Sequence, residues 1–301
     1  MNALLQEFGL NGPDFEALKR KHSTPHSRFV KCMGLDVHVS IEGQGPDVVM
    51  VHGFAASLHT WDDVARELVK QHRVIRFDLP PFGLTGPVLD ESGKPRKLDV
   101  AFYQTFVDAL LDTLDVKRCV MIGNSFGGFL SWDQAQRHPE RVRGAVLSDS
   151  VAYQQPLPIY IKLFTIAPIA GLVKHSVPAF LLRMAIRDVY GDASKIKPFV
   201  LKRYLELFMH KPNRSAVPGM VGVFTDGELG AHRLPDIKVP CLIVWGDADR
   251  WVKPEMGERM HKDIPGSRLI RYPGVGHIPM EETPEQFACD CMEFISTLPG
   301  A

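Results

Sequence analysis

The sequence predicts a mostly parallel, doubly wound α/β sheet into which a helical segment is inserted. Short apolar runs alternate along the chain with segments of helical spacing, which is typical of repeated strand–helix units. The alternation lapses between about residues 151 and 233, where no strand is evident. The 301 residues are 45% hydrophobic and 23% charged, a composition that can bury a large core.

The strands are predicted from their length and apolar character. Residues 29–42 alternate around Gly34, as a hairpin of two outer strands would. The runs that follow are nearly continuous in apolar residues, which is typical of strands buried on both faces. We expect them at Asp47–Val51, Arg73–Leu79, Arg118–Ile122, Val142–Leu147, Pro240–Trp245 and, at the edge, Arg268–Tyr272. Helical spacing between them predicts helices over Trp61–Lys70, Val100–Leu114, Phe126–Arg137, Pro254–Ile264 and Pro284–Leu298.

This order predicts a core domain built from residues 28–150 and 234–301, a helical cap over residues 151–233, and an N-terminal extension over residues 1–27. The cap is rich in apolar residues, which either pack against the core or line a pocket for a hydrophobic small molecule. They are Ile159, Ile161, Leu163, Phe164, Ile166, Leu172, Phe180, Leu181, Leu182, Phe199, Leu205 and Phe208.

Composition excludes several classes of function. Lys and Arg together number 35 and equal Asp and Glu, so no charge excess indicates a nucleic-acid partner. The five cysteines lack metal-type spacing, so we expect no metal site and reduced thiols. We also expect no cofactor. The first 30 residues lack the apolar stretch of a signal peptide, which predicts a cytoplasmic protein. Charges and prolines interrupt the apolar stretch 157–186, which excludes a transmembrane span there and leaves peripheral membrane contact open.

Ser125 is the predicted nucleophile. The strand that ends at Ile122 runs into Gly123-Asn124-Ser125-Phe126-Gly127-Gly128, and a helical pattern follows directly. This strand–turn–helix context is the one that a G-x-S-x-G nucleophile requires. The alternative, a glycine-rich turn that holds phosphate, lacks the lysine of a P-loop and the G-x-G-x-x-G order of a dinucleotide site.

The motifs HGF, DLPPFG, GNSFGG, RHPERV, WGDAD and GVGH occur in an order that resembles the α/β-hydrolase fold family, over roughly residues 28–298. His277 follows the last predicted strand, at the carboxyl edge of the sheet, where it is placed to act as the base. Asp249 follows the preceding strand. The family's W-G-x-x-D pattern favours Asp249 over Asp247 as the acid, and Asp149 is a weaker candidate.

The resemblance also implies an oxyanion hole. Its donors would be the backbone N–H groups of Phe126, the residue after the nucleophile, and of Phe54, which follows His52-Gly53. We expect His52 to brace its loop and to take no part in the chemistry.

Ser125 disfavours halide displacement and epoxide opening, because relatives with those activities carry aspartate at that position. The favoured function is hydrolysis of a carboxylic ester through an acyl-serine intermediate. One alternative is cleavage of carbon–carbon bonds in ring-opened aromatic catabolites, although those relatives usually carry tryptophan where Ile278 follows His277 here. A non-catalytic ligand-binding protein and perhydrolysis by the same residues also stay open.

Overall fold

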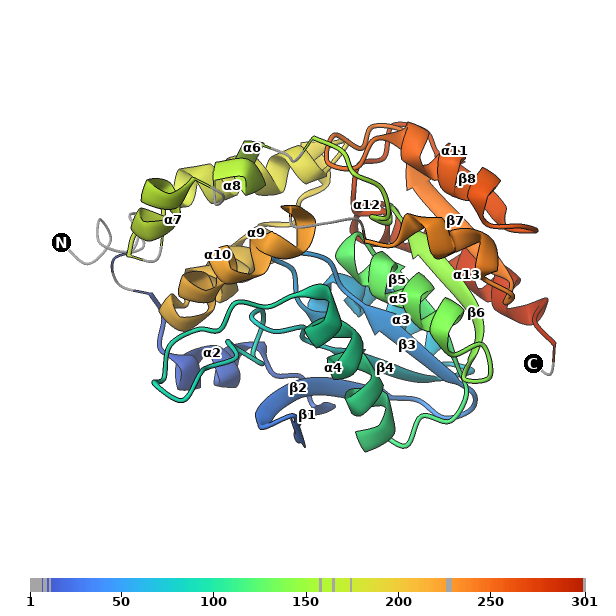
Figure 1. Ribbon diagram of the computed structural model, residues 1–301, viewed down its shortest axis with the longest axis horizontal. Coiled ribbons are helices and arrows are strands. Elements are labelled where there is room, and N and C mark those ends of the chain that lie inside the picture. Colours follow the sequence, from blue (N-terminus) through green and yellow to red (C-terminus); the bar gives the residue numbers. More distant parts are fainter. Residues whose placement is uncertain are drawn as a thin grey trace.

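An eight-stranded sheet organises the chain, as the sequence predicts (Figure 1). The computed structural model describes residues 7, 10, 12–156, 159–163, 166–173, 175–225 and 229–299. The strand order is β1-β2-β4-β3-β5-β6-β7-β8, in which β1 and β2 pair antiparallel, β2 pairs antiparallel with β4, and the remaining pairs are parallel. The strands are β1 Ser27–Cys32, β2 Leu35–Glu42, β3 Asp47–Val51, β4 Arg73–Phe77, β5 Cys119–Asn124, β6 Val142–Ser148, β7 Cys241–Gly246 and β8 Arg268–Tyr272.

Helices cover both faces of this sheet, which explains the near-continuous apolar runs in its central strands. On one face α3 (Asp62–Leu68) and α13 (Pro284–Ser296) pack together through Trp61, Leu68 and Phe287. The other face carries α4 (Val100–Thr113), α5 (Phe126–Arg137) and α11 (Pro254–Asp263). The predicted doubly wound arrangement is therefore confirmed.

The predicted boundaries of the core strands and helices fall within two residues of the observed ones, and two of the differences have a local reason. The strand expected over Arg73–Leu79 ends at Phe77, because the Asp78 carboxylate accepts the backbone N–H groups of Leu58 and Leu84 and so organises the following loop. The helix expected from Trp61 begins instead with a 3₁₀ turn, Leu58–Trp61.

Between β6 and β7 the described residues form helices and no strand. These helices are α6 Ile159–Leu163, α7 Ala167–Val173, α8 Ala179–Val189, α9 Pro198–Met209 and α10 Lys211–Thr225. Figure 1 shows α6, α7 and α8 as an outer layer, with α9 and α10 beneath them. α10 contains Pro218 and lies, like the other four, within the residues for which the sequence predicts a helical cap. Phe164 and the side chain of Ile161 lie outside the described residues.

The N-terminal segment contributes a further helix, α2 (Phe15–His22), which the sequence did not reveal. Lys21 and His22 bind Glu206 of α9 at N–O distances of 2.5 and 2.9 Å, so this helix is attached to the insertion.

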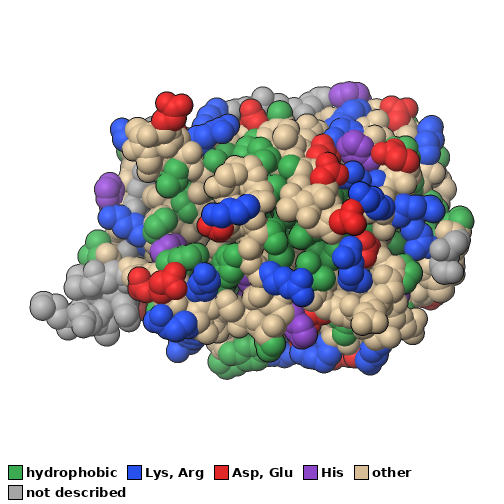
Figure 2. All heavy atoms as spheres, turned by 90° about the horizontal axis from the view of Figure 1, so that it is seen from below, with side chains coloured by type: hydrophobic (Ala, Val, Ile, Leu, Met, Phe, Trp, Pro, Cys, Tyr) green, Lys and Arg blue, Asp and Glu red, His purple; other side chains and the backbone are tan. Residues whose placement is uncertain are grey.

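On the molecular face drawn in Figure 2, Lys and Arg side chains are interspersed with Asp and Glu. Such mixing agrees with the balanced composition and shows no single-sign region on that face. Of the helices that the structure describes, none combines the length and the apolar character that crossing a bilayer requires.

Candidate active site

Ser125 lies on the sharp turn between β5 and α5. Its backbone adopts φ 55° and ψ −117°, a conformation that non-glycine residues rarely take. The turn is possible because glycines flank it: a Cβ atom at position 123 would lie 2.1 Å from the Gly127 oxygen, and one at position 127 would lie 2.1 Å from the Val51 oxygen. The strand and helix approach so closely that only glycine fits, and the serine is left at the apex of the turn.

The two predicted oxyanion-hole donors lie past the carboxyl ends of two neighbouring parallel strands, β3 and β5. Phe126 is the first residue of α5, where the leading N–H groups of a helix have no acceptor within the helix. Phe54 follows β3 and lines the same cavity as Ser125. His52 accepts the Leu79 N–H at Nε2 (2.9 Å) and therefore donates from Nδ1 to the Gly53 carbonyl (2.7 Å), which braces this loop.

His277 and Asp249 are joined by a hydrogen bond. Nδ1 of His277 lies 2.7 Å from Oδ2 of Asp249, and both side chains are buried. The other carboxylate oxygen of Asp249 accepts the backbone N–H groups of Trp251 (2.7 Å) and Val252 (3.0 Å), so the carboxylate is held on both sides. The indole ring of Trp251 stacks beside the imidazole ring of His277, with 6.0 Å between the ring centroids.

The rival carboxylate of Asp247 faces the other way. Its Oδ1 accepts a hydrogen bond from Nε of Arg271, on β8, at 2.6 Å, and this ion pair is exposed to solvent. The structure thus brings Asp249, and not Asp247, to His277.

Asp149, the third candidate, lies beside this pair. Each of the three side chains, Asp149, Asp249 and His277, offers one oxygen or nitrogen atom. These three atoms lie within 4.8 Å of one another. Burial raises the pKa of Asp149 well above its usual value, and the nearby Asp249 carboxylate raises it further. These three side chains are the described group with the geometry to hold a metal ion. However, Asp249 already binds His277 and two backbone N–H groups, which suits an acid–base pair better than metal ligation.

The loop that carries His277 is held by residues that the sequence analysis missed. The buried Glu282, in α12 (Pro279–Glu282), accepts the backbone N–H groups of Gly276 (3.0 Å), Gly191 (2.9 Å) and Asp192 (3.0 Å). The His277 N–H donates to the Val189 carbonyl at 2.7 Å. One carboxylate therefore ties the histidine loop to the end of α8, a contact between distant segments that no local pattern reveals.

Asn124 adds a second support from the core. Its side-chain amide donates to the His277 carbonyl at 2.9 Å, which links the turn before Ser125 to the histidine loop.

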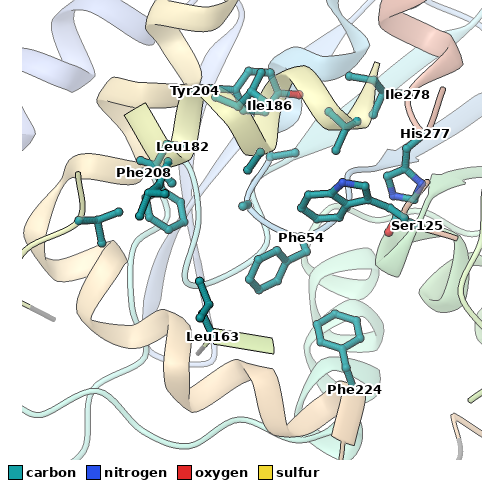
Figure 3. Close-up of a pocket in the computed structure, with 18 of the residues that line it drawn as sticks. Phe54, Ser125, Leu163, Leu182, Ile186, Tyr204, Phe208, Phe224, His277 and Ile278 are labelled. Atoms are coloured by element: carbon teal, nitrogen blue, oxygen red, sulfur yellow. The ribbon is translucent and has the colours of Figure 1, made fainter. Parts of the chain in front are cut away.

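Ser125 and His277 open onto a cavity of about 240 Å³. Figure 3 shows them together at one end, while apolar side chains from the insertion and from Phe54 surround the remaining space. Leu163, Leu172, Leu181, Leu182 and Phe208, five of the apolar cap residues singled out in the sequence, line it. Among the described lining residues there is no Lys, Arg, Asp or Glu.

Comparison with known proteins places this geometry in a family. The sequence model described as alpha/beta hydrolase fold matches residues 46–284. The chain is 31% identical over 257 residues to the uncharacterized hydrolase YugF of Bacillus subtilis, an alignment that covers 82% of this chain and 89% of that protein. It is 27% identical over 270 residues to a 2-hydroxy-6-oxononadienedioate/2-hydroxy-6-oxononatrienedioate hydrolase of a Pseudomonas species, with 86% and 92% covered. The crystal structure of the enol-lactonase from Burkholderia xenovorans superimposes with a TM-score of 0.77 at 21% identity, covering 89% of this chain and 99% of that one.

Replacing Glu282 with glutamine should destabilise the protein. The amide would direct its own N–H groups at backbone N–H donors, and an unsatisfied buried donor costs about 1–3 kcal/mol. We expect Glu282→Gln to lower the free energy of unfolding in urea by that amount. Glu285→Gln, the same change at an exposed position of α13, is the matched control and should have little effect. Equal urea midpoints for the two variants would contradict the role of Glu282.

Proposed function

The chain belongs to the α/β-hydrolase fold family and is a hydrolase, and we propose that it cleaves carboxylic esters of hydrophobic small molecules through an acyl-Ser125 intermediate. The observation that carries the proposal is the buried His277–Asp249 hydrogen bond at one end of an apolar cavity that Ser125 also lines. We also propose that residues 151–233 act as the cap that supplies much of this cavity.

In the proposed mechanism, Ser125 Oγ attacks the ester carbonyl carbon while His277 Nε2 takes the hydroxyl proton. Asp249 holds the Nδ1–H of His277 and stabilises the imidazolium that forms. The backbone N–H groups of Phe54 and Phe126 would donate to the oxyanion of the tetrahedral intermediate. His277 then gives the proton to the departing alcohol oxygen, and water, activated by His277, attacks the acyl-enzyme to release the acid and Ser125.

The apolar lining supports a neutral acyl or alcohol group. A carboxylate moved into such a cavity would lose its hydration without gaining a lysine or arginine partner, because no described lining residue is Lys or Arg. Carbon–carbon cleavage is the second candidate, favoured by the 27% identity to the Pseudomonas dioate hydrolase. That protein's named substrates are dicarboxylates, and the described lining residues include no Lys or Arg to pair with a carboxylate, which weakens the transfer of that activity to this chain.

Ser125→Ala should abolish hydrolysis of p-nitrophenyl esters. Loss of a serine nucleophile lowers kcat by roughly 10⁴- to 10⁶-fold, because the remaining groups act only with it. Steady-state kinetics check the loss, and a fluorophosphonate should label the wild-type protein but not the variant. Ser296→Ala, at an exposed position at the end of α13, is the control and should keep both activities. Retained turnover in Ser125→Ala, or ester binding by the wild type without product release, would overturn the proposal.

A terminal negative charge on the acyl chain should weaken hydrolysis. We expect kcat/KM for a hexanoate ester to exceed that for the adipate half-ester, whose chain ends in a carboxylate, by at least about 100-fold. The reason is the desolvation of an unpaired charge in the cavity. Equal values, or faster turnover of a ring-opened dienone dioate, would favour the carbon–carbon hydrolase instead.

A further inference from the structure

Asp149 is a buried carboxyl group that the mechanism above leaves without a role. It follows β6 directly, adopts φ 45° although it is not glycine, and has no exposed surface. One oxygen accepts the Gly246 N–H of β7 at 2.9 Å, and the other accepts the Ser148 hydroxyl at 2.8 Å. These contacts direct the group toward Asp249, the proposed acid.

Two buried carboxylates in contact cannot both be charged without a cation between them. Within the described chain, neither Asp149 nor Asp249 forms an ion pair with Lys or Arg. Asp249 binds His277 and accepts two backbone N–H groups, whereas Asp149 accepts one backbone N–H group and the Ser148 hydroxyl. Asp149 is therefore the member of the pair that keeps its proton, and burial and the Asp249 charge raise its pKa accordingly.

We propose that Asp149 is a positioning residue whose protonated carboxyl group donates a hydrogen bond to Asp249 and so fixes the acid toward His277. The inference rests on the proposed function. It assigns no contact with substrate to Asp149, which does not line the cavity.

Substitution of Asp149 by asparagine and by leucine tests this inference. The asparagine side chain would keep both an acceptor for Gly246 and an N–H donor for Asp249, whereas leucine removes both at similar volume. We expect Asp149→Asn to keep kcat within about threefold of the wild type. Asp149→Leu should lower kcat by about tenfold or more with little change in KM, because a misplaced acid no longer orients the imidazole. Thermal unfolding and fluorophosphonate titration establish that each variant is folded and count its competent sites.

The outcomes separate this inference from the proposed function. Full activity in Asp249→Asn would show that the proposed function is wrong. If Asp249→Asn is inactive while Asp149→Leu keeps its kcat, only the positioning role is wrong. Equal losses in Asp149→Asn and Asp149→Leu would also overturn it, because a charged Asp149 would then be required.

An independent feature is the outer surface of α6, α7 and α8. Six of the nine exposed large hydrophobic side chains in the described chain fall between residues 159 and 199. Four of them do not line the cavity, are each between 43% and 61% exposed, and form what we term the α6–α8 face: Ile159, Ile166, Phe180 and Met184. Figure 1 shows these helices as the outermost layer of the insertion. Clusters of exposed apolar side chains of this kind mark interaction surfaces.

Charge identifies the partner. Residues 159–189, the stretch that includes α6, α7 and α8, contain four Lys and Arg but one Asp and no Glu, although the whole chain is balanced. On α8, Phe180 and Met184 lie one turn apart, and Arg183 and Arg187 are interleaved with them. Arg183 also forms an ion pair with Glu7. A second copy of the chain would bring like charges together at this face, whereas an anionic bilayer offers opposite charge and an apolar interior.

We infer that the α6–α8 face docks on the surface of an anionic phospholipid bilayer. The inner side of α8 lines the cavity through Leu182, Ile186 and Val189. Docking would therefore bring the cavity close to hydrophobic esters that are dissolved in the bilayer. Phe180 and Met184 do not line the cavity and can be changed without altering it.

Flotation of the full chain with vesicles tests the docking. We expect binding to vesicles of equal parts phosphatidylcholine and phosphatidylglycerol and little binding to phosphatidylcholine alone. Phe180→Ser with Met184→Ser should weaken binding by at least about tenfold, and Arg183→Glu with Arg187→Glu by a similar factor, since each basic residue contributes about fivefold. Met33→Ser with Leu89→Ser, two exposed apolar residues elsewhere, is the matched control and should bind like the wild type.

Hydrolysis of a soluble p-nitrophenyl ester should be unchanged in all these variants, which shows that they are folded. Absence of wild-type binding to the anionic vesicles would overturn the inference, as would equal binding by the Phe180→Ser, Met184→Ser variant. A wild-type dimer in light scattering that this variant dissociates would assign the face to a second copy instead.

Discussion

The close approach of β3, β5 and α5 around Ser125 is the constraint on which the rest of the site depends. Side chains at positions 123 and 127 would overlap backbone atoms of Gly127 and Val51, so both positions require glycine. This contact imposes the positive φ of Ser125. It also places the amino terminus of α5 directly after that serine. Because β3 and β5 are parallel neighbours, the loops that follow them share one edge of the sheet, where Phe54 also lies.

The other side of the site depends on buried carboxylates rather than on apolar packing. Glu282 ties the histidine loop to the end of α8 through three backbone N–H groups, and Asp249 binds His277 while accepting two more. A buried carboxylate is costly unless such donors surround it, so each one holds its neighbouring segments in a single arrangement. The helical insertion is thereby coupled to the loop that carries His277, although the two are far apart in sequence.

The insertion has two surfaces of different character. Its inner side forms most of an uncharged cavity, which bears on the kind of substrate that fits. Its outer side exposes apolar and basic side chains. These are the features from which we infer that the protein meets its substrate at a bilayer surface. α8 contributes to both, since Leu182 and Ile186 face the cavity while Phe180 and Met184 face outward.

The sequence by itself determined the sheet, its order of helices and the positions of Ser125, Asp249 and His277 on strand ends, because periodicity and glycine spacing are local properties of the chain. It also distinguished Asp249 from Asp247 through a motif. Only the tertiary structure decided which polar groups surround them: Glu282, Asn124 and Asp149 form hydrogen bonds across 90 to 153 residues of sequence. Such contacts arise from the crossing of distant segments, and the sequence carries no periodic signal for them. The same reason explains why the division of the insertion into cavity-lining and exposed residues became visible only in the folded chain.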